Sequence, residues 1–265
     1  MAEFVTLTRK AASEATGTAF LLATVIGSGI MGERLSGGNV AIALLANTLA
    51  TGAALVALIL TFGPISGAHF NPAVTLADAS QGGVLWREVP AYIAAQVIGA
   101  FLGVAVAHLM FGAPLFSVSN HMRSGAAQMF SEFVATFGLL SVIWGVTRRR
   151  SDAAPFAVGA YITAAYWFTA STSFANPAVT LARAFSNTFA GIRPADAPGF
   201  ILAQLLGAVA ATLLFRRLAP ALPERAPAVI IAHDEAAFLS ASEGKADGPL
   251  AERVDFRFTE RKDLR

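Results

Sequence analysis

The chain has 265 residues, of which 55% are hydrophobic and 14% charged, and its mean hydropathy of +0.60 is far above that of an ordinary soluble domain. It contains no cysteine, which excludes disulfides, thiol catalysis and cysteine-ligated metals, and its four histidines lack metal-ligand spacing, so we expect neither a metal nor another cofactor. The net charge of +2, with no basic stripe interleaved with aromatic residues, argues against a nucleic-acid partner.

Charged residues are concentrated at the two ends of the chain. Of the 36 charged side chains, three lie in residues 1–10 and sixteen in 221–265, which leaves seventeen for the 210 residues between. We therefore expect a membrane domain over residues 12–217, preceded by a cytoplasmic segment, 1–11, and followed by a cytoplasmic, disordered tail, 218–265. The first apolar run is interpreted as a membrane crossing and not as a signal peptide, because further hydrophobic segments follow it.

A helix needs about 20 apolar residues to cross the hydrocarbon core of a bilayer. Charge-free stretches predict six such crossings, near residues 12–31, 40–62, 90–111, 128–147, 155–172 and 198–217. Two of the charge-free stretches, 35–77 and 153–182, are longer than one crossing uses, and each ends in the string NPAVTLA. Irregular backbone at membrane depth is tolerated only inside protein or beside a water-filled cavity, so each string is predicted to be a re-entrant segment.

The string NPAVTLA occurs at residues 71–77 and again at 176–182. Because Asn is a strong N-cap and Pro favours the first helical position, each string predicts the start of a half-helix. The duplication extends to SEATGTAFLL with SEFVATFGLL and to AAQVIGAFLG with LAQLLGAVAA, which gives two repeats, about 12–111 and 128–217. Three crossings per repeat is an odd number, so the repeats must be inverted and the two half-helices must point at one another.

Basic residues predict the orientation of the crossings, because cytoplasmic loops carry an excess of Lys and Arg. One side of the six crossings has Arg9, Lys10, Arg87, Arg148, Arg149, Arg150, Arg216 and Arg217. The other side has only Arg34, Arg123, Arg183 and Arg193. We therefore expect both termini to be cytoplasmic, with the first Asn-Pro string entering from the cytoplasmic side and the second from outside.

Taken together, these features resemble the aquaporin, or major intrinsic protein, family over residues 12 to about 217. The resemblance rests on SGAHFNPAVT, the paired Asn-Pro-Ala strings and a glutamate, Glu14 or Glu132, in the first crossing of each repeat. It implies an all-α membrane protein: a right-handed bundle of six transmembrane helices plus two re-entrant half-helices, built as an inverted internal repeat. It also implies a pore within each subunit of a homotetramer surrounded by membrane lipid, and a channel instead of an enzyme.

The resemblance further implies roles for individual residues. The paired motifs would orient the solute and exclude cations, because the half-helix N-termini carry partial positive charge. The residues of the two motifs are Asn71, Pro72, Ala73, Asn176, Pro177 and Ala178. Backbone carbonyls would line the pore at Gly67, Ala68, His69, Thr172, Ser173 and Phe174. Glu14 and Glu132 are expected to hold the re-entrant backbone by hydrogen bonds, with proton carriage as the alternative reading. The His69 side chain is interpreted as packing in the vestibule and not as a base.

Selectivity in the family is set at an outer constriction of four residues, which spacing from the two Asn positions identifies as Thr51, Ala164, Ser173 and Val179. Most relatives carry Arg at the last position, and Val supplies neither its charge nor its donors. The other three are small, so we expect a wide, mainly neutral filter. Arg183 shares the face of Val179 about 6 Å further out, and it is either a positive collar at the mouth or an interfacial arginine.

Val at this position also resembles the AqpS-type bacterial aquaglyceroporins associated with arsenic resistance. The expected function is passive, bidirectional permeation of small uncharged solutes, namely arsenite or methylated arsenicals, glycerol, urea and water. The expected location is the plasma membrane, as a multi-pass protein of the bacterial inner membrane. Three alternatives remain open: a water-selective or glycerol-type aquaporin without a metalloid role, a coupled secondary transporter, and a non-conducting scaffold.

Overall fold

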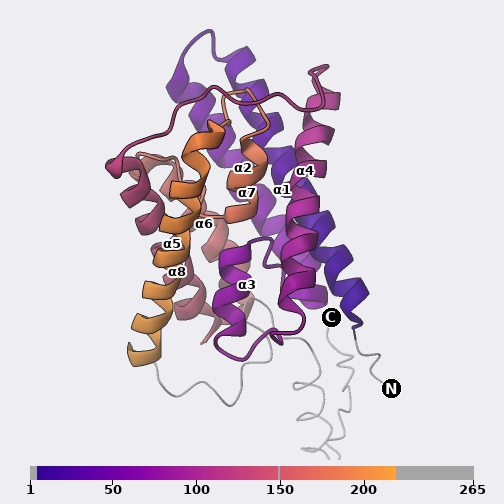
Figure 1. The fold of residues 1–265 in the computed structure, drawn as a ribbon, viewed down its shortest axis with the longest axis vertical. Coiled ribbons are helices and arrows are strands. Elements are labelled where there is room, and N and C mark those ends of the chain that lie inside the picture. Colours follow the sequence, from indigo (N-terminus) through magenta and orange to yellow (C-terminus); the bar gives the residue numbers. More distant parts are fainter. Residues whose placement is uncertain (1–4, 149, 219–265) are drawn as a thin grey trace, which may run out of the picture. The chain divides into compact units, whose positions relative to one another are not determined.

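The computed structural model describes residues 5–148 and 150–218, and the described chain is all helical (Figure 1). Six long helices and two half-helices follow one another, with short 3-10 turns, η1 and η2, before α6 and α8. Their bounds are α1 (Leu7–Leu35), α2 (Val40–Ser66), α3 (Pro72–Ala79), α4 (Val89–Met110), α5 (Ala126–Thr147), η1 (Ser151–Ala153), α6 (Ala154–Phe168), α7 (Pro177–Arg183), η2 (Pro194–Asp196) and α8 (Ala197–Leu218). The tail predicted to be disordered lies outside the described residues, apart from Leu218.

The two halves of the described chain repeat the same packing. In the first half α1 packs against α2 and α4, and in the second α5 packs against α6 and α8. Contacts between the halves run from α2 to α6, from α3 to α8 and from α7 to α4, so each half-helix touches the last helix of the opposite half. Figure 1 shows α3 and α7 between the long helices, one beyond the other. This is the arrangement that the repeated sequence predicts.

Glycine lets the long helices approach closely at equivalent places in the two halves. A Cβ added to Gly99 of α4 would lie 2.2 Å from the backbone oxygen of Ala15 in α1. One added to Gly207 of α8 would lie 2.4 Å from the backbone oxygen of Phe133 in α5. Neither distance leaves room for a methyl group, so these glycines are helix-contact positions of the kind common in membrane bundles.

Within the described residues, five helices are long and apolar enough to cross a membrane: α1, α2, α4, α5 and α8 with η2. The sixth long helix, α6, has only 15 residues and ends at Phe168, four residues before the predicted end of its crossing. The chain then runs without regular helix until α7 begins at Pro177. Large apolar side chains such as Phe20, Leu102 and Phe130 are exposed, as expected of a surface that meets lipid.

Candidate functional site

Each Asn-Pro string begins a half-helix. Asn71 Oδ1 accepts a hydrogen bond from Ala73 N at 2.9 Å, and Asn176 Oδ1 accepts from Ala178 N at 3.0 Å and from the next backbone amide. Both Asn residues are extended, and a proline occupies the first position of each helix. These N-caps use the carbonyl end of each Asn side chain, which leaves the amide nitrogen to point away from the helix.

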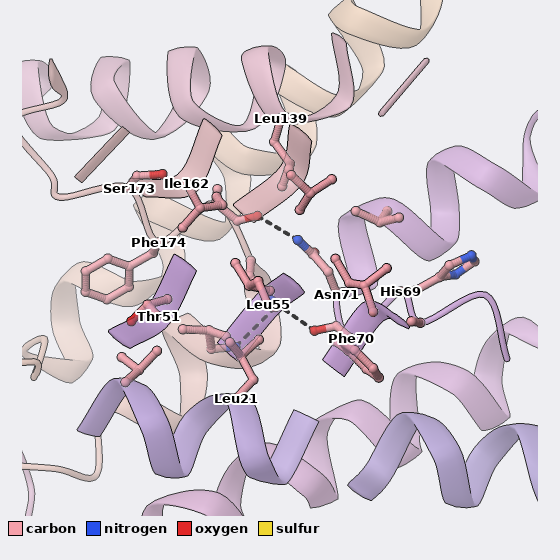
Figure 2. Close-up of a pocket in the computed structure, with 18 of the residues that line it drawn as sticks. Leu21, Thr51, Leu55, His69, Phe70, Asn71, Leu139, Ile162, Ser173 and Phe174 are labelled. Carbon is pink, nitrogen blue, oxygen red and sulfur yellow. Dashed lines mark hydrogen bonds between the residues drawn. The ribbon is translucent and has the colours of Figure 1, made fainter. Parts of the chain in front are cut away.

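The amide nitrogens join the tips of the two half-helices. Asn71 Nδ2 donates to the carbonyl oxygen of Ala175 at 2.8 Å, and Asn176 Nδ2 donates to that of Phe70 at 2.7 Å. Each Asn therefore bonds the residue that precedes the other Asn, and Figure 2 shows this contact from Asn71. Each Nδ2 carries two hydrogens, and the second is not used by any described residue.

Glu14 in α1 holds the segment that leads into α3. Its carboxylate, fully buried, accepts from the backbone amides of His69 at 2.9 Å and Phe70 at 2.7 Å. It also accepts from Ser66 Oγ at 2.6 Å and Gln96 Nε2 at 2.8 Å. Four hydrogen bonds satisfy a charge that would otherwise be costly to bury.

Glu132 in α5 repeats this arrangement for α7. Its carboxylate, also fully buried, accepts from the backbone amides of Phe174 and Ala175, both at 2.8 Å. It accepts as well from Gln204 Nε2 at 2.6 Å, and Gln204 bonds Thr180 Oγ1 at 2.8 Å. The bonds are those expected of residues that hold the backbone of a re-entrant segment.

The backbone before each Asn has an unusual conformation. Positive φ angles occur at Gly67 (86°), Ala68 (50°), Thr172 (61°) and Ser173 (48°), a region that non-glycine residues seldom adopt. Among the described residues, no hydrogen bond ends on the carbonyl oxygens of these four or of Phe174. A row of carbonyls without protein partners is what a ladder for a passing solute requires.

A buried cavity passes the two Asn side chains (Figure 2). Figure 2 shows Thr51 and Phe174 toward one end, His69 at the other and Asn71 between them. The cavity walls are mostly aliphatic, as in Leu21 and Leu139. The predicted residues that line it are Thr51, Ala68, His69, Asn71, Ser173, Phe174, Asn176 and Val179. Gly67, Thr172 and the four Pro and Ala residues of the motifs are not in the lining.

One of the four predicted filter residues is misplaced. Ala164 lies on an exposed face of α6, whereas Ile162 and Tyr166 of the same helix line the cavity. Tyr166 is 3% exposed, and its hydroxyl donates to Thr51 Oγ1 at 3.3 Å. Counting back a fixed number from Asn176 fails because the count crosses a non-helical segment, where the rise and direction per residue are not those of a helix. Tyr166 therefore brings a large aromatic side chain to a part of the cavity where only small residues were expected.

Arg183 also lines the cavity at the Thr51 end. It is 2% exposed, its Nε donates to the carbonyl of Ala190, and its Cζ lies 3.3 Å from the centroid of the Phe174 ring. This position excludes the reading of Arg183 as an interfacial arginine exposed to lipid or solvent. It agrees with the alternative of a positive group close to the filter.

Sequence reasoning gave no role to Arg123, which lies in the loop before α5. Its side chain donates to the carbonyls of Gly191 at 2.8 Å and Ser171 at 3.1 Å, and so ties together two loops at the Thr51 end. Burial lowers the pKa of Arg123 to about 10. The pKa of the neighbouring His121 is lowered by burial and by the positive charges of Arg123 and Arg183. No local pattern in the loop could have identified these contacts.

At the other end of the cavity, the His69 ring packs among polar groups. His69 Nδ1 lies 3.1 Å from Thr75 Oγ1, and His69 Nε2 lies 3.7 Å from Asp78 Oδ2. The ring also lies against Tyr92, with 5.5 Å between ring centroids. These contacts agree with a packed vestibule residue, and no sequence pattern indicated that Asp78 would accompany it.

Comparisons with known proteins agree with this geometry. The sequence profile "Major intrinsic protein" matches residues 1–173 and 149–243. The chain is 57% identical over 218 residues to Aquaglyceroporin AqpS of Rhizobium meliloti (strain 1021), covering 82% of this chain and 93% of that protein. It is 38% identical to Aquaporin NIP3-1 of Oryza sativa subsp. japonica, over 60% of this chain and 52% of that protein.

The solved structure of the aquaglyceroporin from Plasmodium falciparum superposes on the fold. The TM-score is 0.65 at 21% identity, and the match covers 81% of this chain and 98% of that one. This likeness supports the aquaporin fold independently of close sequence similarity. With a family profile that matches most of its length and a relative this similar, the chain belongs to the major intrinsic protein family of channels.

Proposed function

We propose that this channel passes small uncharged solutes in both directions through a pore within each subunit, without coupling to an ion gradient. The observation that carries the proposal is the cavity lined by Asn71 and Asn176, at the point where the two half-helix tips meet. The second hydrogen of each amide would donate to the solute, and the carbonyl rows on either side would accept from it. No reaction is catalysed.

Cation exclusion at the same point follows from the half-helices. Each N-terminus behaves like roughly half a positive charge, and the two tips point at one another. A cation between them would meet both charges in a cavity whose walls are mainly apolar. A file of water would have to reverse its hydrogen bonds there, which hinders proton relay.

The aperture of the filter would be set by Thr51, Tyr166, Ser173 and Val179. Val179 brings no charge and a small side chain where Arg is usual in the family, while Tyr166 takes the place that Ala164 was expected to fill. We propose passage of glycerol, urea and water, with arsenous acid or methylated arsenicals as the most specific candidates. AqpS, the relative named above, is an aquaglyceroporin, which favours solutes larger than water.

We further propose a homotetramer in the bacterial inner membrane, surrounded by lipid, with both termini cytoplasmic. The orientation rests on the asymmetry of basic residues between the two sides of the crossings. In this orientation the Thr51 end of the cavity is the outer mouth and the His69 end the inner mouth.

A stopped-flow panel on proteoliposomes tests the function directly. Water, glycerol, urea and arsenous acid should each enter faster than into empty vesicles, and dissipating the proton or sodium gradient should leave the rates unchanged. Rates that collapse with either gradient would establish a coupled transporter instead. Rates equal to those of empty vesicles for every solute would favour a non-conducting scaffold.

A Val179→Arg variant tests the filter. Arg would narrow the ring, so glycerol and arsenous acid flux should fall by at least tenfold, a barrier change of roughly 1.4 kcal/mol, while water flux falls less. A matched Leu139→Met substitution, which conserves volume in the aliphatic wall, should leave the ratio of glycerol to water flux unchanged. Equal loss of water and glycerol in the Arg variant would contradict the filter assignment.

A further inference from the structure

Arg183 is a buried cation whose donors are mostly unused by the protein. Among the described residues its side chain makes one hydrogen bond, from Nε to the carbonyl of Ala190. Its two terminal nitrogens, which carry four N–H donors, find no acceptor there. A guanidinium that is 2% exposed needs partners for these donors, and the cavity it lines is where water or a solute can supply them.

The neighbouring charges do not neutralise this group. Glu132 directs its carboxylate to backbone amides and a glutamine, and Asp196 accepts from Arg123 N at 2.9 Å and from Arg193 Nη2 at 2.8 Å. Arg123 adds a second positive charge, with its Cζ 5.0 Å from the centroid of the Phe174 ring. Tyr166 and His121 are the remaining titratable groups close to Arg183. The outer mouth is therefore positive.

Phe174 fixes the guanidinium in place. The Arg183 Cζ lies 3.3 Å from the centroid of the Phe174 ring, a stacked cation–π contact, and Phe174 itself packs edge-on against Phe200 at 5.3 Å. A hydrogen bond from Phe174 N to the Glu132 carboxylate holds the same residue. A planar fork held on an aromatic face presents its donors in a fixed direction, which suits recognition of oxygen atoms.

We propose that Arg183 is the cationic solute-selecting residue of the outer mouth, one helical turn beyond Val179. Its open donors bind oxygen atoms of entering uncharged solutes such as polyols, ureas and metalloid hydroxides, and its charge repels cations. Four residues on one helix separate the two Cα atoms by about 6 Å along the axis, and both side chains line the same cavity. This inference rests on the proposed channel function, since it concerns the same pore.

Four variants in proteoliposomes test this inference, with proton leak measured by an internal pH-sensitive dye under a potassium diffusion potential. Arg183→Gln keeps an amide that can still donate to the Ala190 carbonyl but removes the charge. Arg183→Lys keeps the charge. Arg34→Gln is the matched control, because Arg34 is an exposed arginine that does not line the cavity.

We expect Arg183→Gln to raise proton leak by roughly 10- to 100-fold. This is the effect of removing a unit positive charge that lies about 6 to 8 Å from a proton in the pore, at an effective dielectric constant near 20. Arg183→Lys and Arg34→Gln should leak protons no faster than the parent protein. A double variant, Val179→Arg with Arg183→Gln, should restore the barrier by placing the charge one turn deeper.

Three outcomes would overturn the inference. The proton leak of Arg183→Gln could equal that of the parent protein, or the proton leak of Arg183→Lys could be as fast as that of Arg183→Gln. The third outcome is a double variant that leaks protons as fast as Arg183→Gln. Glycerol flux separates this failure from failure of the proposed function. If the parent protein passes glycerol and the proton leak of Arg183→Gln equals that of the parent protein, only the role of Arg183 is wrong. If the parent protein passes no solute, the channel proposal itself is wrong.

Discussion

Replacing Glu14 by Gln separates the two readings of the buried glutamates, as braces for the re-entrant backbone or as proton carriers. The carboxylate oxygens of Glu14 accept four hydrogen bonds, two of them from the backbone amides of His69 and Phe70. Gln keeps the shape of the side chain but turns one oxygen into a donor. One of the two backbone amides must then face a donor, whichever way the Gln amide is turned.

The cost can be worked from this geometry. Gln96 can turn its own amide to present an oxygen, since its Oε1 has no partner among the described residues, so that contact can be rescued. A backbone amide cannot turn, and a buried donor left without a partner costs about 1 to 3 kcal/mol. For a domain of this size each kcal/mol lowers Tm by about 2 to 4 °C. We expect a drop of roughly 2 to 12 °C.

Thermal unfolding in detergent is the assay, with Glu132→Gln as an internal replicate, because Glu132 accepts the equivalent backbone amides. Glu33→Gln is the matched control, since Glu33 is exposed and its loss of charge should leave Tm unchanged. If Glu14→Gln and Glu132→Gln keep the parent Tm and instead alter proton flux, the bracing role is wrong and proton carriage must be considered again.

Two further predictions concern packing and charge. Gly99→Ala should lower the free energy of unfolding by about 1 to 3 kcal/mol or prevent folding, because the added Cβ would lie 2.2 Å from the Ala15 carbonyl oxygen. Gly145→Ala is the control for the same unfolding assay. The nearest atom to its added Cβ is 3.6 Å away, so this variant should be neutral or stabilising. The pKa of His121 should lie below 6.5, so this group contributes stability that is present above pH 6.5 and lost as pH falls through its folded pKa. In an NMR titration Arg183→Gln should raise that pKa toward 6.5, and an unchanged value would show that the two side chains do not interact.

Features that depend on local chemistry could be predicted from the sequence. Asn followed by Pro caps a helix wherever it occurs, so the starts of α3 and α7 followed from residues 71–72 and 176–177 alone. The long charge-free runs fixed the crossings because a bilayer sets the length of a helix that spans it.

Features that depend on an irregular segment could not be predicted in the same way. Thr51, identified by a count of the same kind, does line the cavity, and only residues 67–70 separate the end of α2 from Asn71. In the second half seven residues, 169–175, separate the end of α6 from Asn176, and their path is set by bonds to Arg123 and Glu132. A fixed count through such a segment placed Ala164 on the wrong face. Knowing that α6 ends at Phe168 would have identified Tyr166.

The two ends of the cavity differ in one hydrogen bond that both halves of the chain make. In each half a side chain donates to the carbonyl of a serine before the Asn-Pro motif, but the donor is a different residue type. Ser66 and Ser171 precede the two motifs by five residues each, and the carbonyl of each accepts a hydrogen bond from a side chain outside the half-helices. At Ser66 the donor is the hydroxyl of Tyr92, at 2.9 Å; at Ser171 it is the guanidinium of Arg123, at 3.1 Å. Both donors fix the start of a carbonyl row, but only the second brings a charge. The inverted repeat thus gives the same bond to a serine carbonyl twice, and only the bond at the Thr51 end of the cavity comes from a charged side chain, so under the proposed function selection by charge would act at that end.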